Sequence, residues 1–269
     1  MKICVLQLPT LPMSENRIDY YIKIAKDNDS KIVLMGEYVL NSFFNELTKM
    51  PKSIIKEQTA HKKELFEKLA KKYNITIIAP IILLKSNGIF KVCAKFTPTN
   101  TKFFEQKFLI NYSHWNEDKF FANSNNFDKN SDFSMPIFSQ DGFKFGIAFG
   151  FEAHFDIIWQ HFMQKKVDCV LMPTASTFES NERWEMLLKT RAWLNSVFII
   201  RANRIGKTQF LDRECDFYGN SFAIDPNGEM INALRNEEGV MLCNIEKSEI
   251  NEARKLWNFK KILENKCLI

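Results

Sequence analysis

Runs of apolar and β-branched residues alternate with amphipathic stretches along most of the chain, and this alternation limits the fold more than any other feature. The runs predict strands at residues 3–8, 31–35, 75–84, 90–96, 102–107, 143–149, 167–172 and 197–201. Several are apolar over most of their length, which is typical of strands buried on both faces. Strands that alternate with helices predict an α/β class in which helices cover the faces of sheets.

The helices are predicted from apolar residues that recur every three or four positions. The clearest begins near Ser53 and carries four such side chains: Leu65, Phe66, Leu69 and Tyr73. Further helices are predicted at 155–166, 182–195 and 246–257. A strand at 220–225, a tight turn at 226–228 and a strand at 230–234 predict a hairpin, and residues 239–245 predict one more strand.

The composition is that of a globular protein with a large core, because 45% of the 269 residues are hydrophobic and 26% are charged. No linker rich in proline, glycine or serine divides the chain, so a single domain over 1–269 is predicted. The net charge of +5 comes from dispersed lysines. A nucleic-acid surface requires clustered basic residues and stacking aromatics, so no nucleic-acid partner is expected.

The cysteines and the N-terminus indicate a cytoplasmic protein. The six cysteines show no C-x-x-C spacing, and four lie in apolar runs, as buried thiols do in a reducing compartment. The first apolar run ends at Gln7 and has no cleavage site, so it predicts a strand and not a signal peptide. No apolar stretch approaches eighteen residues, so no membrane span is expected.

Polar groups stand at the ends of three predicted strands, where an α/β sheet presents its reactive side chains. They are Glu37 after residues 31–35, Lys107 at the end of 102–107, and the turn Gly150-Phe151-Glu152 after 143–149. A single polar residue at a strand end is also common simply because the strand reaches solvent there. The order of all three groups along the chain is a more specific signal for function than any one of them.

With their neighbours, these groups resemble the motifs of the nitrilase superfamily of carbon-nitrogen hydrolases over essentially the whole chain. Gly36-Glu37 is similar to the glutamate motif, Lys107-Phe108-Leu109 with Trp115-Asn116-Glu117 to the lysine motif and second glutamate, and residues 146–155 to the nucleophile strand and turn. Counterparts also exist for residues 168–175, Arg183-Trp184, Arg191-Ala192, Ala202-Asn203-Arg204 and residues 218–221.

The resemblance implies a four-layer α-β-β-α sandwich, assembled as a homodimer or larger homo-oligomer, with residues 257–269 reaching into a partner. It also implies hydrolysis of a small amide, carbamoyl or nitrile substrate by a Glu-Lys-Cys triad, with no cofactor and no metal. In that chemistry Glu37 takes the proton of the thiol, and Lys107 and the Phe151 N–H stabilise the developing negative charge. Glu117 orients Lys107 or relays protons.

The same likeness places Glu152, His154, Thr174 and Ala175 around the substrate. His154 has an equally simple structural use, a hydrogen bond to a backbone carbonyl. Thr174 and Ala175 are alternatively an ordinary loop. Glu117 is alternatively an exposed carboxylate.

Gly150 stands where the resemblance requires the catalytic cysteine. Its neighbours Phe149 and Phe151 offer no nucleophile, Cys169 lies in an apolar strand, and Cys215 lies in a predicted loop whose carboxylates raise a thiol pKa. Glycine suits a strained turn because it tolerates positive φ, which favours a natural residue over an introduced one. The presence of Glu37, Lys107 and Glu117 favours an introduced glycine, because a chain without catalysis has no evident chemical use for them.

Three functions remain open. The first is a carbon-nitrogen hydrolase whose nucleophile is absent, so that the chain is inactive or severely impaired. The second is a binding or regulatory protein that recognises a small molecule on the same scaffold without cleaving it. The third is a metal site formed by Glu152, His154, Asp156 and His161, which a helix beginning after His154 would separate.

Overall fold

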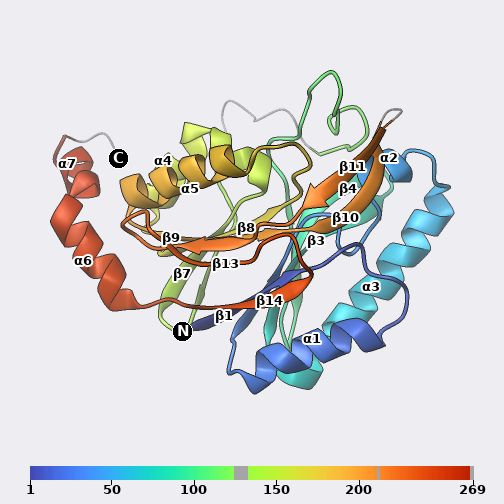
Figure 1. The fold of residues 1–269 in the computed structure, drawn as a ribbon, viewed down its shortest axis with the longest axis horizontal. Helices are drawn as coiled ribbons and strands as arrows, with labels where there is room; N and C mark the ends of the chain where they lie inside the picture. The colour runs from blue at the N-terminus through green and yellow to red at the C-terminus, as the bar shows by residue number, and fades with distance from the viewer. Residues whose placement is uncertain (124–132, 211–212, 267–269) are drawn as a thin grey trace.

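A computed structural model describes residues 1–123, 133–210 and 213–266 of the chain. Its first sheet has six strands in the order β14-β1-β2-β3-β4-β5 (Figure 1). β1, β2 and β3 are parallel neighbours, and the other pairs are antiparallel. The strands are β1 (Lys2–Gln7), β2 (Ile32–Met35), β3 (Thr76–Lys85), β4 (Gly88–Phe96), β5 (Thr101–Glu105) and β14 (Gly239–Asn244).

The second sheet also has six strands, in the order β13-β12-β9-β8-β7-β6. β7, β8 and β9 are parallel, so this sheet and the first are built alike. The strands are β6 (Ile137–Gln140), β7 (Phe143–Ile147), β8 (Cys169–Thr174), β9 (Phe198–Asn203), β12 (Phe222–Ile224) and β13 (Met230–Ala233). A separate two-stranded hairpin joins β10 (Ile205–Phe210) to β11 (Arg213–Tyr218).

Helices cover the outer face of each sheet. α1 (Asn16–Asp27) and α3 (Lys52–Tyr73) share an apolar cluster with the first sheet, and α4 (Asp156–Gln164) and α5 (Asn181–Asn195) share one with the second. A third cluster joins the inner faces of the two sheets, with Val5 and Leu34 from one and Leu171 and Ile200 from the other. The predicted α-β-β-α sandwich is therefore confirmed, and Figure 1 shows α1 and α3 on the opposite side of the sheets from α4 and α5.

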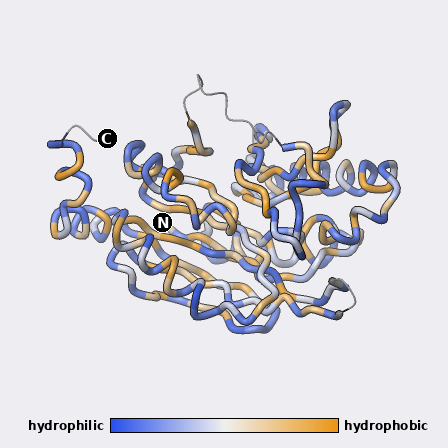
Figure 2. Tube along the Cα trace, turned by 90° about the horizontal axis from the view of Figure 1, so that it is seen from above, coloured by the Kyte–Doolittle hydropathy of each residue, from blue (hydrophilic) through white to orange (hydrophobic). Residues whose placement is uncertain are grey.

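The α3 helix illustrates how the periodic pattern is used. Leu65, Phe66 and Leu69 are buried against the first sheet, as their spacing predicts. The helix follows Pro51 and ends at Asn74, which adopts the left-handed conformation common just after a helix. Figure 2 shows the same division, with hydrophobic residues along the interior strands and mixed residues along the helices.

Some boundaries and elements differ from the sequence-based predictions. β5 ends at Glu105, so Lys107 lies beyond the strand that was predicted to carry it. The β10–β11 hairpin and helix α1 were not predicted, and Cys215 lies in β11 and not in a loop. The hairpin escapes prediction because polar residues such as Lys207, Gln209 and Glu214 interrupt its apolar pattern. Two short elements remain: α2 (Phe44–Leu47), between β2 and α3, and the 3-10 turn η1 (Gly150–His154), between β7 and α4.

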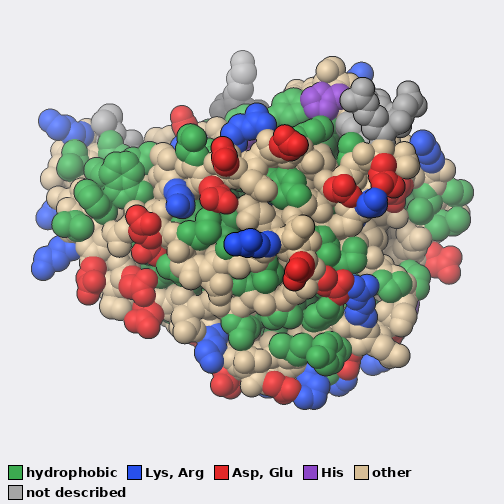
Figure 3. All heavy atoms as spheres, in the orientation of Figure 1, with side chains coloured by type: hydrophobic (Ala, Val, Ile, Leu, Met, Phe, Trp, Pro, Cys, Tyr) green, Lys and Arg blue, Asp and Glu red, His purple; other side chains and the backbone are tan. Residues whose placement is uncertain are grey.

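The C-terminal helices α6 (Lys247–Trp257) and α7 (Phe259–Asn265) lie at one end of the molecule (Figure 1). They include most of the segment 257–269 that was predicted to reach into a partner; residues 267–269 lie outside the described residues, and the contact stays a prediction. Among the described helices, none has the length and apolarity needed to cross a membrane. On the face in Figure 3, lysines and arginines lie among acidic side chains.

Candidate functional site

Three buried charged side chains meet at one point of the fold. Glu37 follows β2, Lys91 lies on β4, and Glu117 belongs to the segment after β5. Lys91 Nζ lies 2.5 Å from Glu37 Oε2 and 2.7 Å from Glu117 Oε1. The Tyr38 hydroxyl donates to the same Glu117 oxygen. One ammonium therefore bridges two carboxylates.

The backbone around Glu37 ties the two sheets together. The Glu37 N–H donates to the Thr174 carbonyl at the end of β8, at 3.0 Å. A Cβ at Gly36 would lie 2.8 Å from the backbone nitrogen of Arg204, so the close approach of the chains requires glycine there. Glu37 is consequently held where β2 of one sheet meets β8 of the other.

Burial and the neighbouring charges perturb the acid–base properties of this cluster. Burial raises the pKa of Glu37 to about 7, although Lys91 acts to lower it and Glu117 acts to raise it further. Burial acts to lower the pKa of Lys91, but Glu117 and Glu37 outweigh burial, so the Lys91 pKa is raised. Lys91 is therefore charged at neutral pH, while Glu37 titrates near it.

Lys107 does not lie between the glutamates, in contrast to the role the resemblance implied. Side chains alternate between faces along a strand. Phe103 of β5 faces the helix-covered side and Phe104 faces the other sheet. Just beyond the strand, Gln106 is buried and Lys107 is half-buried, and the ion pairs of Glu37 and Glu117 are with Lys91. Lys107 contacts the site through its backbone N–H, which donates to Glu152 Oε1 at 2.6 Å. The ammonium beside Glu37 comes instead from Lys91, which was not anticipated.

Gly150 begins the η1 turn and lines the same pocket as Glu37, and its backbone N–H acts to lower the pKa of Glu37. Its φ is not positive, so the expectation of a strained turn is wrong. Glycine fits at position 150 because a larger side chain would have too little space there. A Cβ at position 150 would lie 2.7 Å from Thr174 Cγ2 and 3.3 Å from Trp184 Cη2. The Thr174 methyl group thus occupies the volume in which a longer side chain at position 150 would begin.

Glu152 fixes the backbone around the turn. Its buried carboxylate accepts from the N–H groups of Phe149 at 2.8 Å, Lys107 at 2.6 Å and Phe108 at 3.3 Å. Burial raises the pKa of Glu152 to about 7, and these three N–H groups act to lower it. Glu152 therefore links η1 to the end of β5 from behind the site. A role in substrate binding stays a prediction.

A pocket of about 360 Å³ opens beside Gly150. Six of the residues singled out in the sequence line it: Glu37, Gly150, Phe151, His154, Thr174 and Ala175. Residues that were not anticipated, or were noted only within motifs, complete the wall: Ile110, Tyr112, Trp115, Ser176, Thr177, Phe178, Ser180, Arg183, Trp184 and Leu187. Glu117, Lys107 and Glu152 are not part of this lining.

Six of the sixteen residues that line the pocket carry aromatic rings, His154 among them. His154 Nδ1 lies 2.9 Å from the Phe151 carbonyl oxygen, which fits the structural use considered for it, while its ring packs edge-on against Trp184 with centroids 5.5 Å apart. Thr174 Oγ1 lies 2.9 Å from Asn203 Oδ1, which holds the threonine methyl group toward Gly150. An apolar cavity with a few fixed polar groups is typical of a small-molecule site.

The sequence does contain one indication that Lys91 is buried. It is a lysine inside the otherwise apolar run Ile89-Phe90-Lys91-Val92-Cys93, and a buried lysine requires acidic partners. Nothing in the sequence alone says which glutamates those partners are. Ser176 and Phe178 carried no signal, because they lie in the irregular segment after β8.

The two alternative nucleophiles do not reach the pocket. Cys169 is fully buried in β8, as expected for a core thiol, and burial raises its pKa well above the ordinary value. Cys215 is partly buried in β11 and packs near Phe43 and Phe217. Neither residue belongs to the pocket wall.

The alternative metal set is separated in space. Glu152 is engaged by backbone N–H groups, and Asp156 forms an ion pair with Arg191 at 2.6 Å. Within the described part of the chain, no group of three or more histidines, cysteines, aspartates and glutamates is arranged to hold a metal ion.

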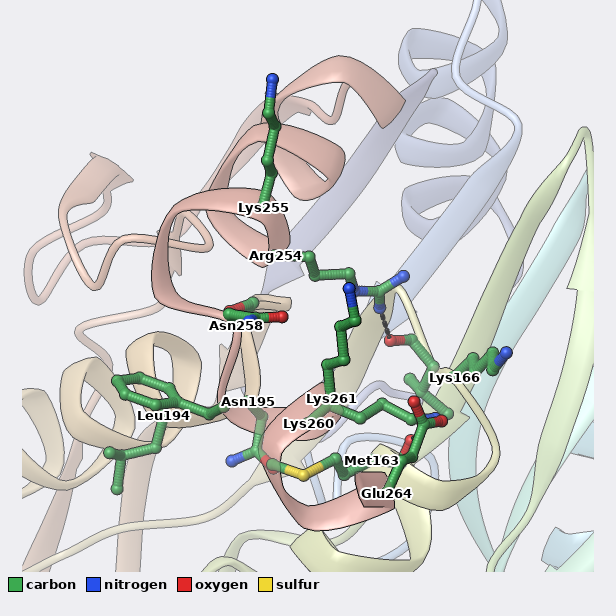
Figure 4. Close-up of a pocket in the computed structure, with 13 residues that line it drawn as sticks. Met163, Lys166, Leu194, Asn195, Arg254, Lys255, Asn258, Lys260, Lys261 and Glu264 are labelled. Carbon is green, nitrogen blue, oxygen red and sulfur yellow. Dashed lines mark hydrogen bonds and ion pairs between the residues drawn. The ribbon is translucent and has the colours of Figure 1, made fainter. Parts of the chain in front are cut away.

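A second cavity, of about 470 Å³, lies between α6, α7 and the ends of α4 and α5, away from the glutamates (Figure 4). Arg254 of α6 pairs with Asp168 at 3.0 Å and donates to the Val167 carbonyl, and Lys260 of α7 donates to the Met163 carbonyl of α4 at 2.8 Å. These basic side chains therefore serve mainly to attach the C-terminal helices.

Comparison with known proteins agrees with this architecture. The family model described as carbon-nitrogen hydrolase matches residues 13–255. The chain is 26% identical over 153 residues to the N-carbamoylputrescine amidase of Solanum tuberosum, and the match covers 52% of this chain and 49% of that protein. The chain thus spans about half the length of this curated relative.

Solved structures show the same fold. The carbon-nitrogen hydrolase of Helicobacter pylori G27 superposes with a TM-score of 0.82 at 18% identity, over 97% of this chain and 94% of that one. A mutant of the amidase from Nesterenkonia sp. AN1, in complex with butyramide, gives a TM-score of 0.74 at 17% identity, over 96% and 97% of the two chains. Because the family model matches residues 13–255, the protein belongs to the carbon-nitrogen hydrolase family.

Proposed function

We propose that this protein binds a small amide or carbamoyl compound in the pocket beside Gly150 and forms no thioester with it. The observation that carries the proposal is the filled space at position 150, where Thr174 Cγ2 would lie 2.7 Å from a Cβ. Position 150 carries no nucleophilic side chain, and the Thr174 methyl group lies where one would begin. The pocket itself remains open at about 360 Å³.

Polar groups suited to an amide remain in the pocket. The Glu37 carboxyl lines its wall and can accept a hydrogen bond from an amide N–H. The Phe151 N–H lies in the first turn of η1, where N–H groups have no partner inside the turn, and it can donate to an amide oxygen. Aromatic side chains such as Trp115 and Phe178 cover the apolar part of a ligand.

Two names among the similar proteins support this choice of ligand. The Solanum tuberosum relative is an N-carbamoylputrescine amidase, and the Nesterenkonia amidase mutant holds butyramide. Butyramide and N-carbamoylputrescine are therefore the first probes for this chain.

A second candidate function is slow hydrolysis in which water replaces the thiol. The pKa of Glu37, which burial raises to about 7, favours it because a general base works best when its pKa is near the working pH. Lys91 would then hold the Glu37 carboxyl in position beside the pocket. This candidate differs from the first because hydrolysis of an amide releases ammonia and a carboxylic acid, whereas binding releases neither.

Calorimetric titration and an ammonia-release assay on the same protein separate the two functions. We expect butyramide or N-carbamoylputrescine to bind without release of ammonia, and Ala175→Leu to abolish binding because it fills the pocket. Lys255→Leu, on the exposed side of α6, is the matched control and should bind normally. Ammonia release that Glu37→Gln removes would establish the second function, and the absence of binding by both probes would exclude the first.

A further inference from the structure

The buried cluster beside the pocket contains two carboxylates and one ammonium. Lys91 pairs with both Glu37 and Glu117, and in the described part of the chain no second cation lies within ion-pair distance of either glutamate. Glu117 Oε2 is buried without a hydrogen-bond partner. With both glutamates ionised, the three side chains therefore carry one negative charge that no ion pair within the cluster balances, and such a charge is costly in a protein interior.

Charges further away do not remove this surplus. The titratable groups that interact electrostatically with Glu37 are Lys91 and Cys93 of β4, Glu117 after β5, Glu152 of η1, Arg201 of β9 and the neighbouring Tyr38. Glu152 adds a negative charge to the cluster. Arg201 is positive, but it also interacts with Glu185 and Tyr218. The nearest groups thus leave Glu37 short of positive charge.

The protein can balance the surplus with a proton. Burial raises the pKa of Glu37 to about 7, and Glu117 acts in the same direction. At neutral pH about half of the molecules therefore carry a proton on Glu37. A ligand that brings its own positive charge to this carboxylate would take the place of the proton.

The pocket gives such a ligand access to Glu37. Among the described residues that line it, Glu37 is the one carboxylate. Arg183 and His154, the described wall residues that can carry a positive charge, are exposed, so water and salt screen them. The wall also contains Trp115, and the indole ring is the side chain that attracts cations most strongly.

We propose that the pocket binds an amidine, whose protonated amidinium group pairs with the Glu37 carboxylate. The inference rests on the proposed function, which makes the pocket a ligand site and places a planar group of this size beside Glu37. An amidinium has the shape of an amide but carries a second NH2 group in place of the oxygen. It forgoes the hydrogen bond from the Phe151 N–H and gains a charge-assisted pair with Glu37, which is the stronger of the two interactions.

Three probes of nearly the same size test the proposal by calorimetric titration. They are butyramidine, which is a cation at neutral pH, butyramide, which is neutral, and butyrate, which is an anion. We expect butyramidine to bind about tenfold more tightly than butyramide, the size of effect that separates charge-assisted from neutral hydrogen bonds. Butyrate should bind more weakly than butyramide.

Proton release provides a second measurement that needs no variant. Because the amidinium displaces the proton of Glu37, titrations in buffers of different ionisation enthalpy should show that butyramidine releases about half a proton at pH 7. For the same reason, butyramidine should bind about tenfold more tightly at pH 8 than at pH 6. Butyramide has no charge with which to displace the proton, so its binding should release none.

Variants assign the preference to its cause. Glu37→Gln should bring the butyramidine and butyramide affinities together. Glu117→Gln leaves the pocket wall intact but makes the cluster neutral, so it should reduce both the preference and the proton release. Glu238→Gln, at an ion pair with Arg17 outside the pocket, is the matched control and should preserve both. If Glu37→Gln fails to fold, Glu117→Gln and the proton release test the same step.

The outcomes separate this inference from the function on which it rests. If butyramide binds and butyramidine binds no more tightly, the proposed function stands and the amidine inference is wrong. A preference that survives Glu37→Gln, or butyramidine binding without proton release, also overturns it. Binding of butyramidine alone, with proton release, supports the amidine and contradicts the amide as ligand. If none of the three probes binds, the pocket is not a site for such ligands and both proposals fail.

Discussion

At the scale of single residues, Gly150 and Thr174 form a matched pair. The Thr174 hydroxyl is fixed by Asn203 and the Ala202 carbonyl, so its methyl group has one direction available, toward Gly150. Interiors are packed too densely for two groups to share this volume. The identity of residue 150 is therefore coupled to that of residue 174, a coupling that the sequence does not reveal because the two positions are far apart along the chain.

This coupling predicts how a nucleophile can be returned to the site. We expect Gly150→Cys alone to lower the free energy of unfolding by about 1–3 kcal/mol, the usual effect of overpacking, because its Cβ displaces Thr174. Adding Thr174→Ser removes Cγ2 and keeps the hydroxyl, so the double variant should recover much of the loss. Urea unfolding of the four proteins in this cycle measures the coupling.

Thr174→Ser by itself measures the effect of losing the methyl group, which should lower the free energy of unfolding by about 1 kcal/mol. Additive effects of the two substitutions would mean that position 150 has room for a side chain without movement of Thr174.

At the scale of elements, the register of two strands decides which lysine enters the site. β4 and β5 pair with Val92 opposite Glu105, and the Gln106 N–H donates to the Lys91 carbonyl at 3.2 Å, so Lys91 and Gln106 are cross-strand neighbours on one face. Gln106 Oε1 is buried without a hydrogen-bond partner. We expect a lysine at position 106 to reach the same two glutamates from the neighbouring strand.

A charge exchange between the strands tests this reading. We expect Lys91→Gln to lower the free energy of unfolding by about 3–5 kcal/mol, because it leaves Glu37 and Glu117 buried without their cation. The double variant Lys91→Gln with Gln106→Lys should recover at least half of that loss. Chemical denaturation of the single and double variants gives these differences.

Lys107→Gln is the matched control, since it makes the same chemical change at the lysine that the family resemblance indicated. We expect it to alter stability by no more than about 0.5 kcal/mol, as for a typical surface substitution. If Lys107→Gln lowered the free energy of unfolding as much as Lys91→Gln does, the pairing of Lys91 with the two glutamates would be contradicted.

These elements also show what the sequence can and cannot predict. Alternating periodicities predicted an α/β class with helices covering sheets, because Leu65–Leu69 place apolar side chains on one helix face and Ile3–Leu6 is apolar throughout, as in a strand buried on both faces. The four-layer order was implied by the family resemblance. Glu37 was predicted because a strand end is a local feature. Lys91 was missed because its role depends on cross-strand register, which sets it beside Gln106 and not beside Lys107. The contact of the Thr174 methyl group with position 150 depends on tertiary packing alone.

At the scale of the whole molecule, carboxyl groups sealed inside the sandwich link its stability to pH. Burial raises the pKa of both Glu37 and Glu152 to about 7, against an ordinary value near 4.5. Between these values the folded chain binds protons that the unfolded chain has released. The contribution of these groups is therefore fully present below pH 4.5 and is lost as the pH rises through 7.

We accordingly expect the free energy of unfolding to fall between about pH 5 and pH 8, by up to about 1.4 kcal/mol per pH unit for each group. The raised pKa of Lys91 acts in the same sense but only above pH 10, outside this window. Glu152→Gln should lower stability overall, because an amide cannot accept from all three backbone N–H groups, yet it should make the pH dependence shallower. Urea unfolding at pH 5.5, 6.5 and 7.5 measures the slope.

Glu238→Gln provides the control for this slope. Arg17 and Tyr21 donate to the Glu238 carboxylate and hold its pKa below the ordinary value, so Glu238 is ionised in both the folded and the unfolded chain above pH 5. Its replacement should shift stability by a constant amount and leave the slope unchanged. A slope that Glu152→Gln leaves intact would place the titrating group elsewhere, and Glu37→Gln would then show whether the site itself carries the pH dependence.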